Sequence, residues 1–283
     1  MKRKNILILA FLYFVFTMPL CAQIFNFKNH SFSMQVETGA FYGTAYEILY
    51  ETSNSDAYLN ELQLNIKPLW FVGAFFEYAP KEPLANNAMF FNFDFKLGIP
   101  SKTGVMEDRS WTDRSNPNKV TSFYSYDNEI AKAFTINSAI GFSVPLAGNF
   151  LAKVSFDIMI INNYFEVYYQ IWRAINPVFG IEWHRNMFVF KSAVSVNTKV
   201  FGSAGYFGDR YNTEKGVLIE PKSSFFYNIS DHFSVGVSFA YTSIDSRGDV
   251  TRKKYLLPDE EISNGGGAKY KAFTGELMFK ITF

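Results

Sequence analysis

The chain has almost no cysteine, almost no net charge and no long hydrophobic run beyond residue 20. Among its 283 residues, Cys21 is the one cysteine, and the formal net charge is +1. A nearly neutral chain gives no reason to expect nucleic acid or an acidic partner. The mean hydropathy of -0.03 excludes a bundle of membrane-spanning helices.

The first residues have the pattern of a secretion signal. Basic residues precede the apolar stretch Ile6–Leu20, which is too short for a membrane-spanning helix. We therefore expect a signal peptide over residues 1–22 and a mature domain over residues 23–283. The residues before Cys21 match the motif of a lipidated cysteine poorly. The mature domain then contains no cysteine and forms no disulfide.

The rest of the chain is rich in aromatic residues and alternates between apolar and polar side chains. Aromatics make up 19% of residues, and the stretch from Phe233 to Thr242 shows the period of two that a β-strand requires. Several runs exceed the usual strand length of about five or six residues and reach the roughly 9–11 that cross a bilayer. About ten such runs are expected, which agrees with an even-stranded barrel. They fall near residues 32–50, 58–78, 87–99, 130–144, 150–162, 164–183, 187–204, 215–228, 232–245 and 269–283.

The connections between these runs differ in length and character. The tight turns are Lys81–Asn86, Pro145–Asn149, His184–Asn186 and Asn228–Asp231, and the long polar connections are Ile99–Glu129 and Ser246–Ala268. This asymmetry, together with a last strand that ends on Phe283, predicts an all-β fold: a ten-stranded antiparallel transmembrane β-barrel of the outer membrane. We expect a monomer in contact with outer-membrane lipid, with its long loops outside the cell and both termini in the periplasm.

The alternation also predicts which side chains face lipid and which fill the lumen. An outward belt is expected from Phe134, Ile140, Phe190, Val194, Val237, Phe239, Phe279 and Ile281. A barrel of this size is filled by inward side chains, so charged residues in it must pair. Those expected to pair are Lys67, Lys191, Lys199, Glu61 and Glu276.

Three segments give the chain a resemblance to a known family. They are Asp108-Arg109-Ser110-Trp111-Thr112-Asp113-Arg114-Ser115-Asn116-Pro117, the run from Gly43 to Tyr50, and the run from Trp172 to Gly180. With the strand order, they make the chain resemble the omptin family of outer-membrane endoproteases. The resemblance implies a ten-stranded barrel with an external active site. The sequence has no zinc motif of the His-Glu-x-x-His kind and no phosphate-binding glycine loop, so no metal or other cofactor is expected.

The resemblance also implies roles for single residues. Asp108 falls on the first member of the family's catalytic acid pair, and Ser110 falls on the second. Glu47 falls on an acid that receives the basic side chain of a substrate, and we expect Asp113 to bind substrate with it. Arg173 falls on one position of the family's lipopolysaccharide clamp and is expected to bind lipid.

The second half of the family's catalytic site departs from its pattern. The family has Asp-x-His there, whereas this chain reads Gly208-Asp209-Arg210-Tyr211. Arg210 falls on the histidine, and a guanidinium that stays protonated cannot act as a base. Asp209 is therefore the acid left to act with Asp108. The family's long third loop is also expected to be reduced to a turn near Asn162-Asn163.

The chain's three histidines complete this reading. His30, His184 and His232 precede the first strand or occupy tight turns, a membrane thickness of about 30 Å from the long loops. None is expected to replace the family's catalytic histidine.

Three functions remain open from the sequence. The first is a surface receptor or adhesin that has lost proteolysis, in which Glu47, Glu107, Asp108 and Asp113 form an acidic mouth for basic peptides or host proteins. The second is an active endoprotease that cleaves near basic residues with a histidine-free acidic site. The third is a pore or structural barrel without a specific ligand.

Overall fold

The computed structural model describes residues 30–50, 58–85, 87–111, 119–165, 168–206, 209–252 and 260–283. The predicted signal peptide lies outside these residues. The described residues form twelve β-strands and contain no helix long and apolar enough to cross a membrane. The strands are β1 (His30–Tyr50), β2 (Tyr58–Pro80), β3 (Ala88–Gly98), β4 (Ser101–Ser110), β5 (Ser122–Pro145), β6 (Phe150–Phe165), β7 (Tyr168–Arg185), β8 (Phe188–Asn197), β9 (Phe201–Tyr206), β10 (Asp209–Asn228), β11 (Phe233–Arg252) and β12 (Glu260–Thr282).

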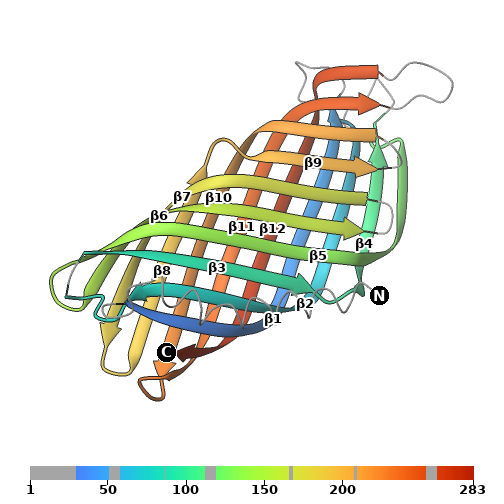
Figure 1. Ribbon diagram of the computed structural model, residues 1–283. Helices are drawn as coiled ribbons and strands as arrows, with labels where there is room; N and C mark the ends of the chain where they lie inside the picture. Colours follow the sequence, from blue (N-terminus) through green and yellow to red (C-terminus); the bar gives the residue numbers. More distant parts are fainter. Residues whose placement is uncertain are drawn as a thin grey trace, which may run out of the picture.

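These strands form one antiparallel ring of ten wall positions (Figure 1). β3 and β4 occupy one position, because both pair with β2 on one side and β5 on the other. β8 and β9 likewise share the position between β7 and β10. The prediction of a ten-stranded antiparallel barrel is therefore confirmed.

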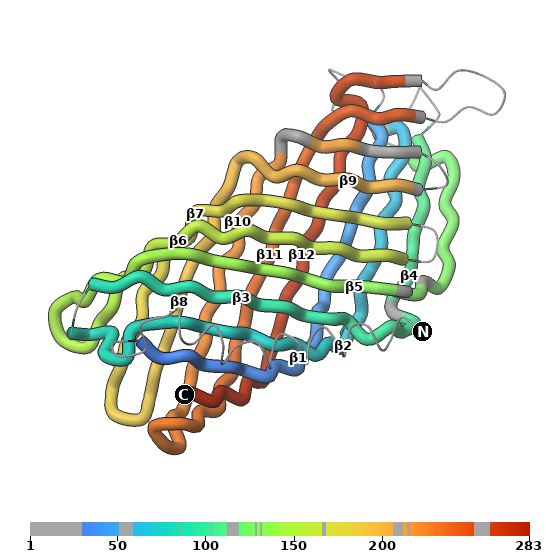
Figure 2. Tube along the Cα trace, in the orientation of Figure 1, coloured from blue at the N-terminus to red at the C-terminus, as the bar shows by residue number. Residues whose placement is uncertain are grey.

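The first and last strands close the ring, running side by side (Figure 2). Their pairing extends from Ser33 opposite Thr282 to Leu49 opposite Gly266. The backbone N–H of Phe283 donates to the carbonyl of Phe32 at 2.8 Å, so the chain ends within the ladder. A closed ladder leaves no unpaired edge along this wall, which is what lipid requires of a sheet.

The barrel has two distinct ends. At the short-turn end lie the β2–β3, β5–β6, β7–β8 and β10–β11 connections and the carboxyl terminus. At the hairpin end, β1 connects to β2, β4 to β5, β6 to β7, β9 to β10 and β11 to β12. The four predicted tight turns are all at the short-turn end, within a few residues of their expected positions.

Two expected connections are wrong, and a third lies a few residues from its expected position. Ile99–Glu129 contains β4 and the start of β5, and Ser246–Ala268 contains the end of β11 and the start of β12. Both faces of these strand ends carry polar side chains, which hid their period of two from the sequence. The expected turn at Asn162-Asn163 lies inside β6, which continues to Phe165; the hairpin is short but turns later.

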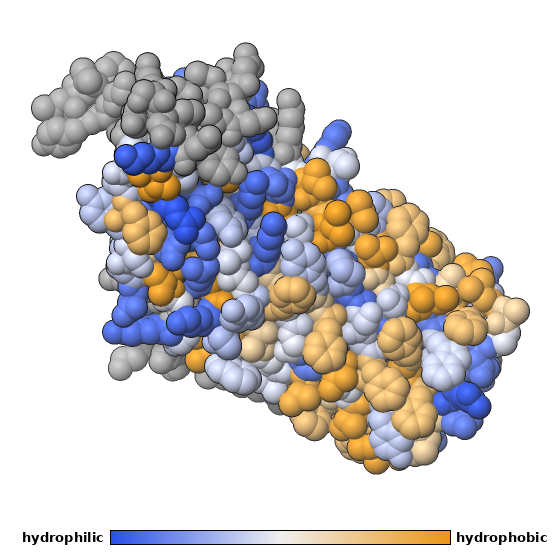
Figure 3. All heavy atoms as spheres, turned by 180° about the vertical axis from the view of Figure 1, so that it is seen from behind, coloured by the Kyte–Doolittle hydropathy of each residue, from blue (hydrophilic) through white to orange (hydrophobic). Residues whose placement is uncertain are grey.

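The outer wall carries the predicted apolar belt. Ile140 is 53% exposed, Phe239 66% and Phe279 58%, and Figure 3 shows apolar side chains gathered over much of one face. Phe190, Val194 and Ile281 are also exposed; Phe134 and Val237 are half-buried.

Substitution in this belt should weaken folding in lipid. Phe239→Arg is expected to destabilise the barrel by about 2–4 kcal/mol, because a cation near the bilayer midplane loses its hydration. Asp245→Arg lies on the same strand and face but nearer the hairpin end, where the cost of the cation falls to about 0–1 kcal/mol. It also removes the exposed ion pair of Asp245 with Lys269, which contributes about 0–1 kcal/mol. Urea unfolding in lipid vesicles measures both. Equal stabilities for the two variants would place Phe239 outside the membrane.

The lumen has an apolar half and an ionic half. The apolar core fills the hairpin half and includes Leu62, Leu64, Ile130 and Trp172. In the other half, lysines meet buried carboxylates. As expected, Lys191 forms ion pairs in the lumen, with Glu77 and Glu182, and so does Glu276, with Lys96 and Lys222. Glu61 instead pairs with Arg109, and Lys67 and Lys199 are exposed; these three were wrongly assigned to the lumen.

Candidate functional site at the hairpin end

Asp108 and Ser110 lie together on the inner face of β4. β4 pairs with β2 so that Asn60 is opposite Ser110 and Leu62 is opposite Asp108. The Asn60 side-chain amide donates to Asp108 Oδ1 at 2.9 Å and to Ser110 Oγ at 3.1 Å. One amide therefore holds both positions that correspond to the acid pair.

Glu47 belongs to the same cross-strand row. It pairs with Leu62, which in turn pairs with Asp108. Two steps between neighbouring strands separate Glu47 from Asp108 by roughly 10 Å. Glu47 is 4% exposed, so it lies within the packed wall below the opening. The structure brings Glu47, Asp108 and Ser110 to one face, but it does not place the two acids in contact.

Glu107 does not belong to this inner row. It neighbours Asp108 on β4 and therefore has the opposite face, where it accepts a hydrogen bond from Arg109. Arg109 also reaches Glu61 Oε1 at 2.8 Å and lies over the Phe123 ring. The expectation that Glu107 contributes to an acidic mouth is wrong, because its charge is paired on the outer wall.

The other half of the expected site is known by its backbone alone. Asp209 pairs with Tyr206, and Arg210 pairs with Gly205 and Thr251. Successive residues of a strand belong to opposite faces, so only one of the two belongs to the inner face. Gly208 and Asp113 lie outside the described residues.

Beneath the site the lumen is closed. Gln170 on β7 lies opposite β1, five positions away in either direction around the ring. Its side-chain amide donates to the carbonyls of Tyr46 at 2.9 Å and Lys269 at 3.3 Å. Trp172 Nε1 donates to Gln170 Oε1 at 3.3 Å. These hydrogen bonds of Gln170 across the lumen, called the Gln170 strut below, were not predicted from the sequence. The alternation of Gln170 with exposed positions could have placed its side chain inward.

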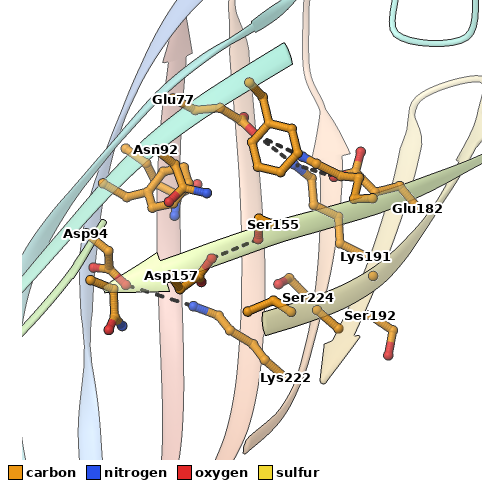
Figure 4. A pocket seen from close by; sticks show the side chains of 18 of the residues that line it. Glu77, Asn92, Asp94, Ser155, Asp157, Glu182, Lys191, Ser192, Lys222 and Ser224 are labelled. Atoms are coloured by element: carbon orange, nitrogen blue, oxygen red, sulfur yellow. Dashed lines mark hydrogen bonds and ion pairs between the residues drawn. The ribbon is translucent and has the colours of Figure 1, made fainter. Parts of the chain in front are cut away.

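The ionic side chains of the lumen line a cavity of about 190 Å³ (Figure 4). A second cavity, of about 700 Å³, lies nearer the short-turn end. Glu77 and Glu182 both accept contacts from Lys153 and Lys191. Within the described residues, no group of histidine, cysteine and acidic side chains could hold a metal ion.

All three histidines lie at the short-turn end. His30 begins β1 and stacks on Tyr78, with ring centroids 4.8 Å apart. His184 lies near the end of β7, and His232 Nδ1 is 3.0 Å from the carbonyl oxygen of Thr282. The chain has no fourth histidine, so none is near Asp108.

Arg173 lies apart from the inner row. It is an exposed residue of β7 between the buried Trp172 and Ala174. Its position therefore places it on the outer face of the wall.

Comparison with known proteins agrees with this architecture. Residues 28–196, more than half of the chain, match the Omptin family. The barrel superposes on the crystal structure of the outer membrane protease OmpT from Escherichia coli with a TM-score of 0.80 and 13% identity, covering 89% of this chain and 97% of that one. OprG from Pseudomonas aeruginosa gives a TM-score of 0.39 at 9% identity, covering 90% and 97%. No curated protein matches the chain.

Proposed function

Because the chain belongs to the Omptin family, we propose that it is a surface barrel of the outer membrane that binds basic peptide segments without cutting them. The hairpin end faces outside, and the short-turn end faces the periplasm. Asp108 and Glu47 attract the basic side chains, together with Asp113 and Asp209. Arg173 on the outer wall contacts lipid headgroups.

The position of the histidines is the observation that carries this proposal. Activation of water needs a base that can accept a proton, and histidine is the side chain best suited to this near neutral pH. All three histidines lie at the far end of the barrel. At the hairpin end, Ser110 occupies the second acid position and shares the Asn60 amide with Asp108. This arrangement favours holding a cation over removing a proton from water.

The alternative function is an endopeptidase that cleaves near basic residues without histidine. The retained Asp108 favours it, because a carboxylate held by a side-chain amide has a fixed orientation. Two acids can share a proton and activate water when they lie close together. That function therefore requires Asp209 to approach Asp108.

A hydrolysis assay separates the two functions. We expect the refolded barrel in detergent to leave a peptide with paired arginines intact while binding it weakly. Exposed ion pairs contribute about 0–1 kcal/mol each, so Asp108→Ala should weaken binding by up to about fivefold, and added salt should act similarly. Mass spectrometry detects cleavage, and fluorescence anisotropy measures binding. Cleavage by the parent that Asp108→Ala abolishes would establish the endopeptidase instead.

A matched pair of variants tests whether cleavage can be restored by replacing the residues at the family's catalytic positions. Both carry Ser110→Asp and Gly208→Asp, and one adds Arg210→His while the other adds Asp209→His. Because only one of the two adjacent positions belongs to the inner face, we expect cleavage from one variant at most. Adding Asn60→Ala to the cleaving variant tests whether the hydrogen bond from the Asn60 amide to Asp108 limits the rate of cleavage.

A further inference from the structure

The cavity of about 700 Å³ occupies the lumen at the short-turn end. Side chains from all ten wall positions line it, and so do residues of the β2–β3, β7–β8 and β10–β11 connections. It therefore reaches the end of the barrel. One layer of charged side chains lines both this cavity and the smaller one of about 190 Å³. We call this layer the lysine layer, and it consists of Lys153, Lys191, Lys280, Glu77 and Glu182.

The lysine layer spans the lumen. Lys191 on β8 lies opposite Glu182 on β7, and its Nζ is 3.3 Å from Glu182 Oε1. The same Nζ is 3.6 Å from Glu77 Oε1 on β2, which is five wall positions away around the ring. Lys280 Nζ approaches Glu77 Oε2 at 3.0 Å, and Lys153 Nζ approaches Glu182 Oε1 at 3.0 Å. Figure 4 shows the side chains of Glu77, Glu182 and Lys191 pointing toward one another. The layer is thus the floor of the larger cavity.

The charges of the lysine layer do not balance. Three ammonium groups meet two carboxylates, which leaves one positive charge in excess. Both carboxylate side chains are 7% exposed, whereas the lysine side chains are 17–26% exposed. His184 lines the same cavity, with Nε2 3.2 Å from Glu182 Oε2, and adds a side chain that can become positive. The accessible part of the floor is therefore mainly cationic.

Nearby carboxylates do not cancel this excess at the cavity surface. A deeper group of charged side chains has the opposite excess and consists of Glu37, Asp94 and Glu276 with Lys96 and Lys222. Glu37 lies opposite Gly73, four residues from Glu77 along β2, which is about 13 Å. Asp157 and Glu220 line the smaller cavity. Among the described residues that line the larger cavity, none of these five acids is present. An anion that enters from the end of the barrel therefore meets the lysines first.

We propose that the larger cavity binds a small soluble oxyanion of the phosphate type, held by Lys153, Lys191 and Lys280. Lysine binds phosphate as a point charge, and a bound anion offsets a positive charge that the two carboxylates leave unpaired. A lipid headgroup has the same chemistry, but the closed wall separates the lumen from the bilayer. This site is independent of the candidate site at the hairpin end.

The test is calorimetric titration of inorganic phosphate into the full refolded barrel in a non-ionic detergent, with ionic strength held constant by sodium chloride. We expect saturable binding of one phosphate per barrel. Absence of saturable binding would overturn the proposal.

Two variants should change the affinity in opposite directions. Lys280→Met leaves two lysines facing two carboxylates, so the layer becomes neutral while its charges stay paired; affinity should fall by more than about tenfold. Glu182→Gln keeps an acceptor oxygen for the lysines but raises the positive excess, so affinity should rise by about tenfold. Changes in the same direction, or no change in either variant, would contradict a site at the lysine layer.

Matched controls make the same chemical changes in the deeper group. Lys222→Met and Glu276→Gln should each leave the affinity for phosphate within about twofold of the parent, because these side chains do not line the larger cavity. Effects as large as those of Lys280→Met and Glu182→Gln would mean that the net charge of the lumen, and not the lysine layer, governs binding. That result would overturn the assignment.

Competition experiments identify the source of the phosphate group. Glycerol 3-phosphate should displace inorganic phosphate, because the cavity has room for a small ester. A short-chain phosphatidic acid should not displace it, because its acyl chains remain in the micelle. Displacement by the phosphatidic acid would overturn the assignment of a soluble ligand. Binding of inorganic phosphate without competition by the soluble ester would support the free ion as the ligand.

Discussion

Lys96→Met is expected to destabilise the barrel by about 3–5 kcal/mol, the cost of breaking a buried ion pair by removing one partner. Lys96 Nζ lies 2.6 Å from Asp94, 3.1 Å from Glu276 and 3.3 Å from Glu37. The substitution leaves three buried carboxylates facing one another with little compensation. Repulsion among them adds to the loss of solvation.

Lys222→Met is the matched control for Lys96→Met. Lys222 Nζ approaches two of the same carboxylates, on Asp94 and Glu276, at 4.0 Å, and its side chain is 33% exposed. Longer contacts and better hydration should limit the loss to about 0–1 kcal/mol. Urea unfolding in vesicles, followed by tryptophan fluorescence, measures both. Similar losses for the two variants would show that position inside the cluster is unimportant.

Trp172→Ala should have an effect of similar size, about 3–5 kcal/mol, because it removes a large side chain from a packed core. Trp172 is 1% exposed and also donates a hydrogen bond to Gln170. A Cβ atom at Gly202 would lie 2.5 Å from the Trp172 ring, which shows how closely the core is filled. The substitution leaves a cavity and frees the Gln170 oxygen.

Trp70→Ala makes the same chemical change on the outer wall, where Trp70 is 61% exposed. It should cost much less, since few packing contacts are lost and no cavity forms. The two unfolding curves test directly whether Trp172 lies in the core and Trp70 on the outer wall.

Planar-bilayer recording tests the packing of the lumen in a second way: the parent should be non-conducting because the lumen core is closed. Steady conductance by the parent would contradict that packing.

The wall of the barrel could be predicted from the sequence because lipid imposes a simple rule on it. A strand in the bilayer must expose apolar residues at every second position, and Phe239 and Phe279 follow that pattern. Outside the bilayer, strands are not required to expose apolar residues at every second position. Glu107 and Arg109 are partly exposed to water and form an ion pair with each other. β4 therefore looked like a loop, although its backbone pairs with β2 and β5.

The candidate site could be predicted only in part. Resemblance to the family led to Asp108 and Ser110, and the structure places both on one inner face. The Asn60 amide that joins them could not be predicted, because it comes from a strand 48 residues away from Asp108 and depends on register. The lumen core was missed for a related reason: Leu62 and Leu64 have the same period of two as lipid-facing residues. Alternation alone does not say which face is inside.

The Gln170 strut has a consequence for how the barrel assembles. Its two acceptors, the carbonyls of Tyr46 and Lys269, belong to β1 and β12, the strands that meet last when the ring closes. They are 124 and 99 residues away from Gln170 along the chain. Before β12 arrives, the apolar core on β7 has no opposite wall to pack against. Closure of the seam and burial of the core are therefore one cooperative step, and an open sheet of fewer strands has no stable interior of its own.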